Sequence, residues 1–349
     1  MQQATTVGGL ARYTPKSDFL DSLWKCVMAI FDVFNGDADG LCGLQQLYLA
    51  QPRDSVLVTG VKRDIELLAR VPAQAGDVVH VLDISLAKNR TEVIRLLAAG
   101  ARVEYFDHHE TGEPLPDTQG LTLHIDTAPE ICTSLLVDQH LDGRYRIWAV
   151  VGAFGDNLAT AARQAAAGLA LGEAQLTQLQ DLGILLNYNA YGEAIEDLIF
   201  PPAQLHQTLR NYSDPLAFIA DEPAYRQLRD GYAEDMEQAQ GLTAQVAKAH
   251  AALYLLPDAA WARRAIGVYA NALVEAFPDR AHAILTPRTT GGGYVVSVRA
   301  PLNRRTGADT LCRQFPTGGG RKAAAGINHL PDNALPTFTE ALLRNFQVG

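Results

Sequence analysis

The feature that most constrains the fold is a series of short apolar segments in the first half of the chain, separated by stretches with helical periodicity. Runs such as DVVHVLDIS and ARVEYFDHH are rich in Val and nearly continuous, as expected of strands that are buried on both faces. The segments between them, such as NRTEVIRLLAAG, repeat apolar residues with a helical period. Strands that alternate with helices predict a parallel sheet covered by helices on both faces.

The remaining sequence divides into two further regions. A helical pattern continues to about residue 237 and is interrupted by Pro201 and Pro202. The last hundred residues change to shorter strand-like runs, which suggest a mixed sheet with one or two helices. The expected organisation is an N-terminal tail over residues 1–24, an α/β domain over 25–200, a helical connector over 201–245 and a smaller mixed α/β domain over 246–349.

Composition limits the function classes. Asp and Glu total 39 against 29 Lys and Arg, so the formal net charge is -10. A protein that holds long nucleic acid usually has a basic footprint, so this balance argues against a processive nuclease on long strands. A local basic pocket for a short polyanion is still compatible with it.

Location is inferred from what the sequence lacks. No apolar stretch approaches eighteen residues, so we expect no membrane span and no membrane partner. The start lacks the basic and apolar regions of a secretory signal, and the four cysteines are scattered. We therefore expect a cytoplasmic protein with free thiols, and leave a homodimer open.

Acidic residues and histidines follow several of the predicted strands directly. In an open parallel sheet the C-terminal ends of the strands share one edge, where ligands bind. These residues are Asp37 and Asp39 in NGDADG, Asp83 in VLDIS, and Asp107, His108 and His109 in YFDHH, with Asp156 in GAFGDN after a later helix.

Clustered carboxylates repel one another and need a cation to remain ionised. Carboxylate oxygens with neutral imidazoles suit Mn²⁺ or Mg²⁺, with zinc, cobalt or iron as alternatives. A pair of such ions can drive hydrolysis at phosphorus. Each motif alone has another interpretation, as a turn before a helix, a helix cap or a surface loop. Only their common position at strand ends favours a metal site.

The motifs NGDADG, LDIS, FDHH and GDN resemble, in this order, motifs I to IV of the DHH phosphoesterases. The segment GGGRKAAAG, residues 318–326, resembles the glycine-rich signature of the DHH-associated domain that follows in this family. The resemblance covers roughly residues 26–160 and 250–330. It implies two domains with the active site in the cleft between them.

The resemblance also implies roles for the residues of the first domain. Asp83 would bridge two Mn²⁺-type ions, with Mg²⁺ and Co²⁺ as alternatives. Asp107 would orient a ligating imidazole, and His109 would face the substrate phosphate. Asn35, two residues before the first acid, completes the predicted catalytic set with these two. The implied metal ligands are Asp37, Asp39, Asp83, His108 and Asp156.

The second domain is expected to bind phosphate through Gly318, Gly319, Gly320 and Arg321, with Arg299 as a further contact. Consecutive glycines allow backbone N–H groups to approach an anion, and the residues after them are expected to begin a helix whose N-terminus favours phosphate. The triplet of residues 291–293 is typical of a hairpin turn.

Two positions depart from the family pattern. Val33 stands where many members have a histidine, and Arg321 stands where the glycine loop usually continues with histidine. The first departure leaves the occupancy of one metal position open. The second retains a cation with a planar fork that suits phosphate.

The leading functional hypothesis is a metal-dependent phosphodiesterase acting on short oligonucleotides or a small nucleotide. The same site would also serve a cyclic-dinucleotide phosphodiesterase or a small-nucleotide phosphatase. A single-strand DNA exonuclease and a catalytically inactive nucleotide sensor are two competing hypotheses. The sequence does not distinguish RNA from DNA, nor does it give the polarity of cleavage or the base preference.

Overall fold

The first half of the chain forms the predicted parallel sheet. The computed structural model describes residues 28–115 and 119–347, so the expected tail over 1–24 lies outside the described residues. All neighbouring strands of the sheet run parallel, in the order β2-β1-β3-β4-β5. The strands are β1 (Ile30–Asn35), β2 (Val56–Gly60), β3 (Val78–Leu82), β4 (Arg102–Asp107) and β5 (Leu121–Ile125).

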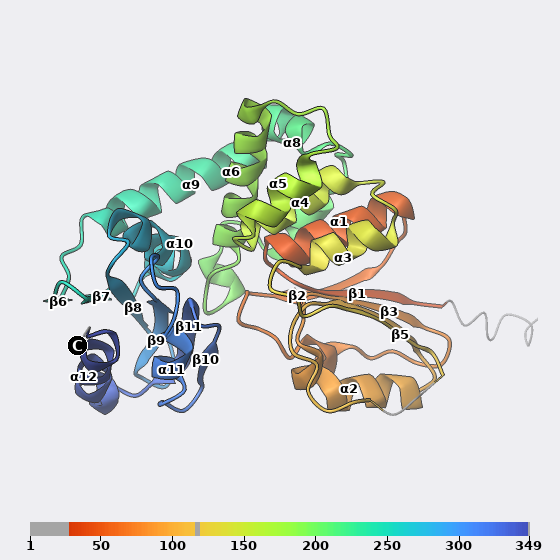
Figure 1. The fold of residues 1–349 in the computed structure, drawn as a ribbon. Helices are drawn as coiled ribbons and strands as arrows, with labels where there is room; N and C mark the ends of the chain where they lie inside the picture. Colours follow the sequence, from red (N-terminus) through yellow and green to blue (C-terminus); the bar gives the residue numbers. More distant parts are fainter. Residues whose placement is uncertain (1–27, 116–118, 348–349) are drawn as a thin grey trace, which may run out of the picture.

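Helices cover both faces of this sheet, as Figure 1 shows. Alternate residues of each strand serve the two faces, so that Phe34 and Leu82 pack under one group of helices while Val33 and Val81 pack under the other. The segment DIELLARV, residues 64–71, separates two strands as the predicted helices do, but it contains only a short 3₁₀ turn, Leu67–Arg70. The first group comprises α1 (Ala38–Ala50), α3 (Thr133–His140) and α4 (Arg146–Gly155); the second comprises this turn and α2 (Leu86–Ala98).

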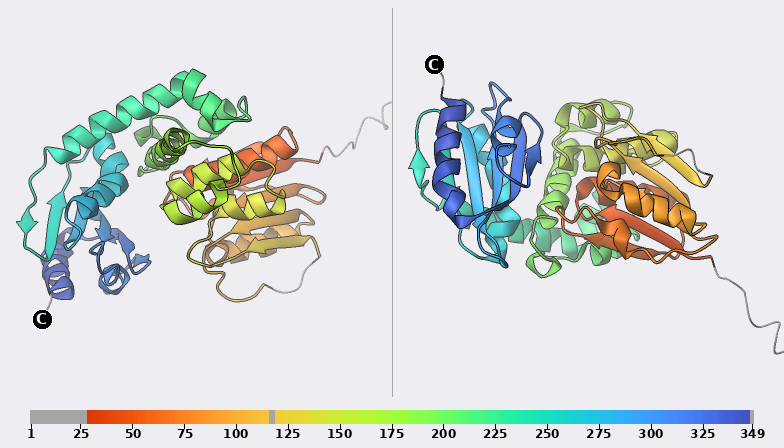
Figure 2. Two further views of the ribbon diagram at one scale, coloured as in Figure 1. Left: turned by 45° about the horizontal axis from the view of Figure 1, so that its top comes forward. Right: turned by 90° about the horizontal axis from the view of Figure 1, so that it is seen from below.

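Further helices lead from this first lobe to the second. The 18-residue helix α9 (Pro223–Gln240) runs from one lobe to the other, as Figure 1 and the left view of Figure 2 show. The helices before it are α5 (Ala159–Ala166), α6 (Glu173–Asn189), α7 (Pro202–Leu209) and α8 (Pro215–Asp221), with a 3₁₀ turn at Ile195–Asp197.

The second lobe is built on a mixed sheet in the order β10-β11-β9-β8-β7-β6, in which only β7 and β8 pair in parallel. Its strands are β6 (Val246–Ala247), β7 (Ala251–Leu255), β8 (Ala281–Pro287), β9 (Tyr294–Arg299), β10 (Gly318–Gly320) and β11 (Ala324–Leu330). Its helices are α10 (Ala260–Ala276), α11 (Ala308–Cys312) and α12 (Leu335–Phe346), with a 3₁₀ turn at Asp332–Ala334.

Two predictions for the second lobe need correction. It has three helices in the described residues, not one or two. No helix follows Gly320, because the chain turns there and returns as β11, which pairs with both β10 and β9. The hairpin predicted at residues 291–293 is confirmed, since these glycines join the antiparallel strands β8 and β9.

Buried ion pairs fasten the second lobe to the helices of the first. Arg263 of α10 donates to both carboxylate oxygens of Asp197, at 2.9 and 2.8 Å. The next residue, Arg264, donates to both oxygens of Asp235 on α9, at 2.8 and 3.0 Å, and the hydroxyl of Tyr188 also donates to this carboxylate. Paired, two-pronged contacts of this kind fix orientation as well as distance, so they set the geometry of the space between the lobes.

No helix within the described residues is both long enough and apolar enough to cross a membrane.

Candidate active site

The first motif forms the turn between β1 and α1. Asp37 caps α1, and its Oδ1 accepts hydrogen bonds from the backbone N–H groups of Asp39 and Gly40, each at 3.1 Å. Asn35 accepts from the N–H of Asp37 at 3.2 Å and donates to the carbonyl of Lys62 at 3.3 Å. In this arrangement Asn35 holds the turn, and its predicted part in catalysis stays a prediction.

Asp39 points from α1 to the start of α3. Its two carboxylate oxygens accept from the N–H groups of Thr133 and Ser134, at 2.7 and 2.8 Å. These N–H groups belong to the first turn of a helix and have no partner within it. Asp39 therefore supplies a cap that its sequence motif did not predict, and each of its oxygens already accepts one hydrogen bond.

Asp83 lies directly after β3 in a left-handed backbone conformation, with φ of 58°. Such a conformation is uncommon for a residue with a side chain and often marks a functional position. Its Oδ1 lies 3.3 Å from the hydroxyl of Thr133 and 3.4 Å from Nε2 of His108. The carboxylate thus points toward the imidazole of His108.

His108 is oriented so that one ring nitrogen faces the acids. Its Nδ1 lies 2.9 Å from the backbone carbonyl of Ile131, and because a carbonyl only accepts, Nδ1 carries the proton. The other ring nitrogen, Nε2, then faces Oδ1 of Asp83 at 3.4 Å, Oδ2 of Asp39 at 3.9 Å and Oδ2 of Asp156 at 4.0 Å. A ring held in this way at its far nitrogen is typical of a metal-binding histidine.

Asp107 contacts the ring of His109 rather than that of His108. It is fully buried and accepts from the N–H groups of Leu86 and His108, at 3.2 and 2.9 Å. Its Oδ1 lies 2.7 Å from Nδ1 of His109, whose side chain is 42% exposed. The ring of His108 is instead held by the carbonyl of Ile131, remote in sequence. The expectation that Asp107 orients a ligating imidazole stays a prediction.

Asp156 reaches the cluster because helices approach closely around it. A Cβ at Gly155 would clash with the Cβ of Ala38 and lie 2.8 Å from the carbonyl oxygen of Gly183, so only glycine permits this contact. The end of α4 is thereby brought against the start of α1. The Oδ2 atom of Asp156 is buried and has no hydrogen-bond partner among the described residues.

The electrostatics of the cluster favour a cation. Burial, together with the neighbouring Asp37 and Asp39, raises the pKa of Asp83 well above its usual value. Burial also raises the pKa of Asp156. Burial opposes protonation of His108, but Asp83, Asp39 and Asp156 raise its pKa to about 10. A bound divalent ion would reverse these shifts by stabilising the charged carboxylates and the neutral imidazole.

Ligand atoms of Asp83, His108 and His109 lie within 4.8 Å of one another. Because Nδ1 of His109 contacts the carboxylate of Asp107, the groups that best fit a divalent ion are Asp83, His108 and the unpartnered oxygen of Asp156. The predicted ligands from four motifs therefore converge at one edge of the sheet. They differ in how many of their atoms remain open to an ion.

Lys62 also belongs to the site, although the sequence motifs did not identify it. It follows β2, and its ammonium contacts Oδ2 of Asp37 and lies 3.0 Å from Oδ1 of Asn187. Burial opposes the charge on Lys62, but Asp37 lowers that cost and raises the pKa of the ammonium above its usual value. The sequence held the signal, because β2 neighbours β1 and Lys62 comes directly after its end in VLVTGVK.

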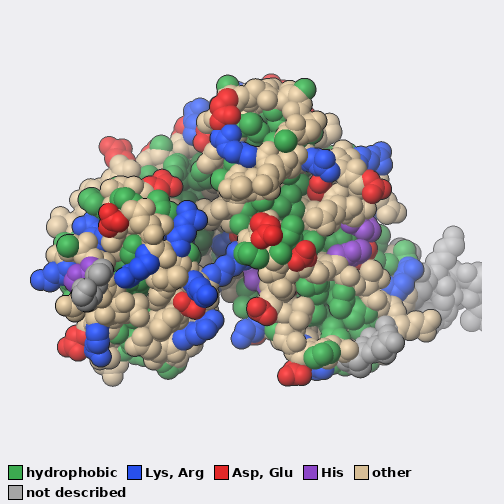
Figure 3. Space-filling view, viewed as in Figure 1, with side chains coloured by type: hydrophobic (Ala, Val, Ile, Leu, Met, Phe, Trp, Pro, Cys, Tyr) green, Lys and Arg blue, Asp and Glu red, His purple; other side chains and the backbone are tan. Residues whose placement is uncertain are grey.

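The second lobe brings Arg321 to the same place. A terminal nitrogen of Arg321 lies 3.4 Å from Nδ1 of His108. Arg299 lies on β9 opposite Ala324 of β11, and its Nε donates to Asn271 at 2.7 Å. At Gly319 an added Cβ would meet no atom within 4 Å, so packing does not require glycine there. Figure 3 shows Lys and Arg side chains on the second lobe where it faces the first.

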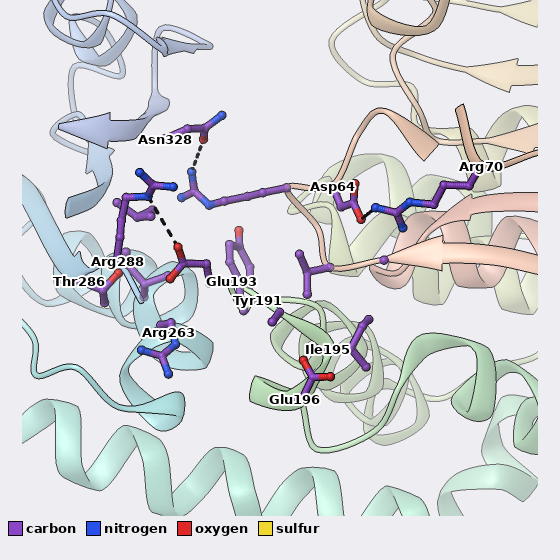
Figure 4. A pocket seen from close by; sticks show the side chains of 17 residues that line it. Asp64, Arg70, Tyr191, Glu193, Ile195, Glu196, Arg263, Thr286, Arg288 and Asn328 are labelled. Carbon is purple, nitrogen blue, oxygen red and sulfur yellow. Dashed lines mark hydrogen bonds and ion pairs between the residues drawn. The ribbon is translucent and has the colours of Figure 1, made fainter. Parts of the chain in front are cut away.

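A cavity of about 620 Å³ extends between the lobes beside this site. Figure 4 shows the ring of Tyr191 standing between the two lobes. Arg63 lines the cavity from the first lobe and donates to Asn328 of the second at 2.7 Å, and Arg288 faces Glu193 at 3.6 Å. None of the predicted site residues lines the cavity, but the ammonium of Lys62 lies 5.8 Å from the centroid of the Tyr191 ring, which does.

No protein-family model matches the chain, and no curated protein matches its sequence. The chain is similar in structure to RecJ from Thermus thermophilus, solved in complex with Mn²⁺, with a TM-score of 0.56 and 19% identity. This match covers 93% of the chain but only 53% of RecJ, so the chain spans about half the length of RecJ. It is also similar to PggH from Vibrio cholerae, a pGpG-specific phosphodiesterase, with a TM-score of 0.51 and 17% identity.

The match to PggH covers 91% of this chain and 98% of PggH. At these identities the likeness establishes the fold, and it confirms the α/β architecture with a second mixed-sheet lobe that the DHH motifs predicted.

Proposed function

We propose that this chain is a divalent-cation-dependent phosphodiesterase that hydrolyses short oligonucleotides or small nucleotides between its two lobes. The observation that carries the proposal is the environment of His108. One of its ring nitrogens faces three carboxylates, and Arg321 from the second lobe lies beside the other. An acidic cation site next to a basic side chain suits a phosphate that must be both bound and attacked.

Asp83, His108 and Asp156 would hold the ion, and Mn²⁺ is the first choice because of their mixed oxygen and nitrogen atoms. The ion would activate water for attack on phosphorus and stabilise charge on the phosphoryl oxygens. The two-ion centre implied by the resemblance would place a second ion against Asp37, which already contacts the ammonium of Lys62. We therefore assign one resident ion, with Lys62 supplying positive charge on the Asp37 side.

His109 is the candidate for proton transfer. Its Nδ1 contacts the carboxylate of Asp107, which fixes the proton on Nδ1 when the ring is neutral. The opposite nitrogen, Nε2, then has a free lone pair on a half-exposed ring. In this role Nε2 would take up a proton and deliver it to the departing ribose oxygen, while Asp107 stabilises the charged imidazole.

The second lobe would anchor the substrate phosphate. Arg321 offers a fork of N–H donors, and the open space above Gly319 would let a phosphate approach the backbone. Arg299 lies two strands away on the same sheet and would add positive charge. In this scheme residues 25–200 form the catalytic domain, 201–245 the connector and 246–349 the substrate-binding domain.

The size of the cavity favours a short substrate. A volume of about 620 Å³ is within the range of small-molecule sites and leaves room for a nucleoside rather than a long strand. Tyr191 offers an aromatic face for a base, and Arg63 offers a cation without a carboxylate partner among the described residues. The similar PggH is a phosphodiesterase specific for pGpG, a linear dinucleotide, which supports a short linear substrate here.

A comparison of substrates tests the proposal. The chain, supplied with Mn²⁺, would be incubated with RNA of two to five nucleotides, pGpG, long single-stranded DNA, a cyclic dinucleotide and a small nucleotide bisphosphate. We expect mononucleotides from the linear short substrates at the highest kcat/KM. Preference for long DNA or for the cyclic compound would replace the short-substrate assignment. Binding of these nucleotides with no hydrolysis of any would instead favour an inactive sensor.

A further inference from the structure

A second group of metal-ligand side chains lies on the first lobe, on the sheet face covered by α3. Glu104 comes from β4, His124 from β5 and His140 from the last turn of α3. Glu104 lies three residues before Asp107 on β4, or about 10 Å along the strand from the active site. The proposed function uses none of these side chains.

The ligand atoms of this group already lie close together. Nε2 of His124 lies 3.0 Å from Oε1 of Glu104, and Nε2 of His140 lies 3.9 Å from the same oxygen. One ligand atom from each residue lies within 4.8 Å of the other two. A tetrahedral zinc ion with bonds of about 2.0–2.1 Å needs ligand atoms roughly 3.4 Å apart, so small side-chain rotations suffice.

Aromatic packing holds the two imidazoles in these orientations. The ring of His124 is stacked on Phe106, with centroids 4.2 Å apart and an interplanar angle of 8°. The ring of His140 meets Phe106 edge-on at 5.3 Å and His124 at 4.7 Å. Because Phe106 is fully buried in the core, it provides a fixed surface for both rings. The Nε2 atoms are thereby held near Glu104 before any ion binds.

A fourth ligand is available nearby. His80 on β3 is the register partner of Glu104, and its Nε2 lies 4.0 Å from Oε2 of that residue. Its Nδ1 lies 2.8 Å from the carboxylate of Asp32. A carboxylate behind the far nitrogen is the usual support of a histidine that binds metal. The side chains of His124 and His140 are 26% and 37% exposed, so solvent ions have access to them.

We propose that Glu104, His124 and His140 form a transition-metal site, with zinc as the preferred ion and His80 as the fourth ligand. Two or three imidazoles with one carboxylate suit zinc, cobalt, nickel or copper. The active site is richer in oxygen and suits manganese or magnesium. The two sites would therefore select different metals.

An ion at this site would clamp α3 onto β4 and β5. This helix has only eight residues, and its other end provides the N–H groups that hold Asp39 and the hydroxyl that contacts Asp83. A metal bound at His140 thus steadies the element on which two active-site carboxylates depend. The peripheral site is a support for the active site, and it exists whether or not the proposed activity is correct.

The test is a count of bound zinc. The full chain, stripped with a chelator and saturated with Mn²⁺, would be titrated with Zn²⁺ by calorimetry alongside His140→Gln, Glu104→Gln and the control His329→Gln. The wild type and the control should bind one more high-affinity Zn²⁺ than His140→Gln, and Glu104→Gln should bind at least tenfold more weakly. With Co²⁺ in place of zinc, the wild type should show tetrahedral absorption bands that His140→Gln lacks.

Equal zinc stoichiometry and affinity in the wild type and His140→Gln would overturn the proposal. Glu104 would then be no more than a hydrogen-bond acceptor between the two imidazoles. Circular dichroism of each variant confirms that the fold is retained, and His140 is exposed enough for its replacement to be tolerated. Because the readout is metal binding, failure of the proposed phosphodiesterase activity would not alter this result.

Discussion

The carboxylates of the active site fall into two pairs with different surroundings. Asp37 and Asp39 have their oxygens engaged by backbone N–H groups and by Lys62. Asp83 and Asp156 lie beside His108, and one oxygen of Asp156 has no partner among the described residues. The same type of residue at the same sheet edge thus serves two purposes. The first pair organises helix ends, and we propose that the second holds the cation.

The largest effect should come from substitution of Asp83, one of the two carboxylates proposed to hold the cation. Asp83→Asn removes the charge that we propose binds the ion, and we expect kcat to fall by roughly 1,000-fold or more, which is about 4 kcal/mol of transition-state stabilisation. In thermal unfolding, the ion-free variant should be no less stable than the wild type. The raised pKa of Asp83, caused by burial and by Asp37 and Asp39, shows that its charge is unfavourable in the folded chain. Retention of a tenth of the activity would place the ion elsewhere.

A substitution in the second lobe should change substrate binding rather than the chemical step. Arg321→Ala removes the guanidinium beside His108, and we expect KM for a short 5′-phosphorylated substrate to rise about 10- to 100-fold. The value of kcat should change only a few-fold. The matched control is Arg313→Ala, an exposed arginine of the same lobe that should leave both constants unchanged. A fall in kcat alone would show that Arg321 acts in the transition state.

Substitution of Asp39, one of the two carboxylates that accept backbone hydrogen bonds, should lower the stability of the fold. Asp39→Asn keeps one acceptor oxygen but directs an NH₂ group toward a backbone N–H of α3. The unsatisfied groups should cost about 1–3 kcal/mol in the free energy of unfolding. Urea titration of ion-free protein measures this loss, with Asp83→Asn as the comparison. If Asp39→Asn is as stable as the wild type, the distinction between the two pairs fails.

The smallest effect is expected from substitution of Tyr191, which lines the cavity between the lobes. Tyr191→Leu removes an aromatic face worth about 1 kcal/mol to a stacked base, so KM for a dinucleotide should rise about fivefold. Tyr191→Phe keeps the ring and should behave as the wild type. A small phosphodiester without a base should not distinguish the three proteins. If all variants have the same KM for the dinucleotide, the base does not bind beside Tyr191.

Much of the fold and the convergence of acids could be predicted from sequence. The rule that parallel strands end at one edge brought together Asp37, Asp83 and His108, and the structure confirms their proximity. The same rule applied to β2 would have identified Lys62. Which oxygens remain free could not be predicted, since Asp39 is engaged by a helix that begins 94 residues later.

The prediction of a helix after Gly320 was wrong for a related reason. The alanines of RKAAAG favour a helix locally, but the segment pairs with β9 and completes the second sheet, and this tertiary pairing outweighs local preference. The partner of the His108 ring was equally hidden, because Ile131 lies in a loop 23 residues away. Local sequence identified the reactive residue types, whereas long-range contacts determine their orientation.

The most direct test of the account is a titration of activity against metal equivalents. Chelator-stripped chain would receive Mn²⁺ in steps, and release of mononucleotides from pGpG would be followed at each step. We predict that activity appears with the first equivalent and reaches its plateau there, because Lys62 would take the place of a second ion beside Asp37. Activity that begins only with the second equivalent, or none at any Mn²⁺ concentration, would contradict it.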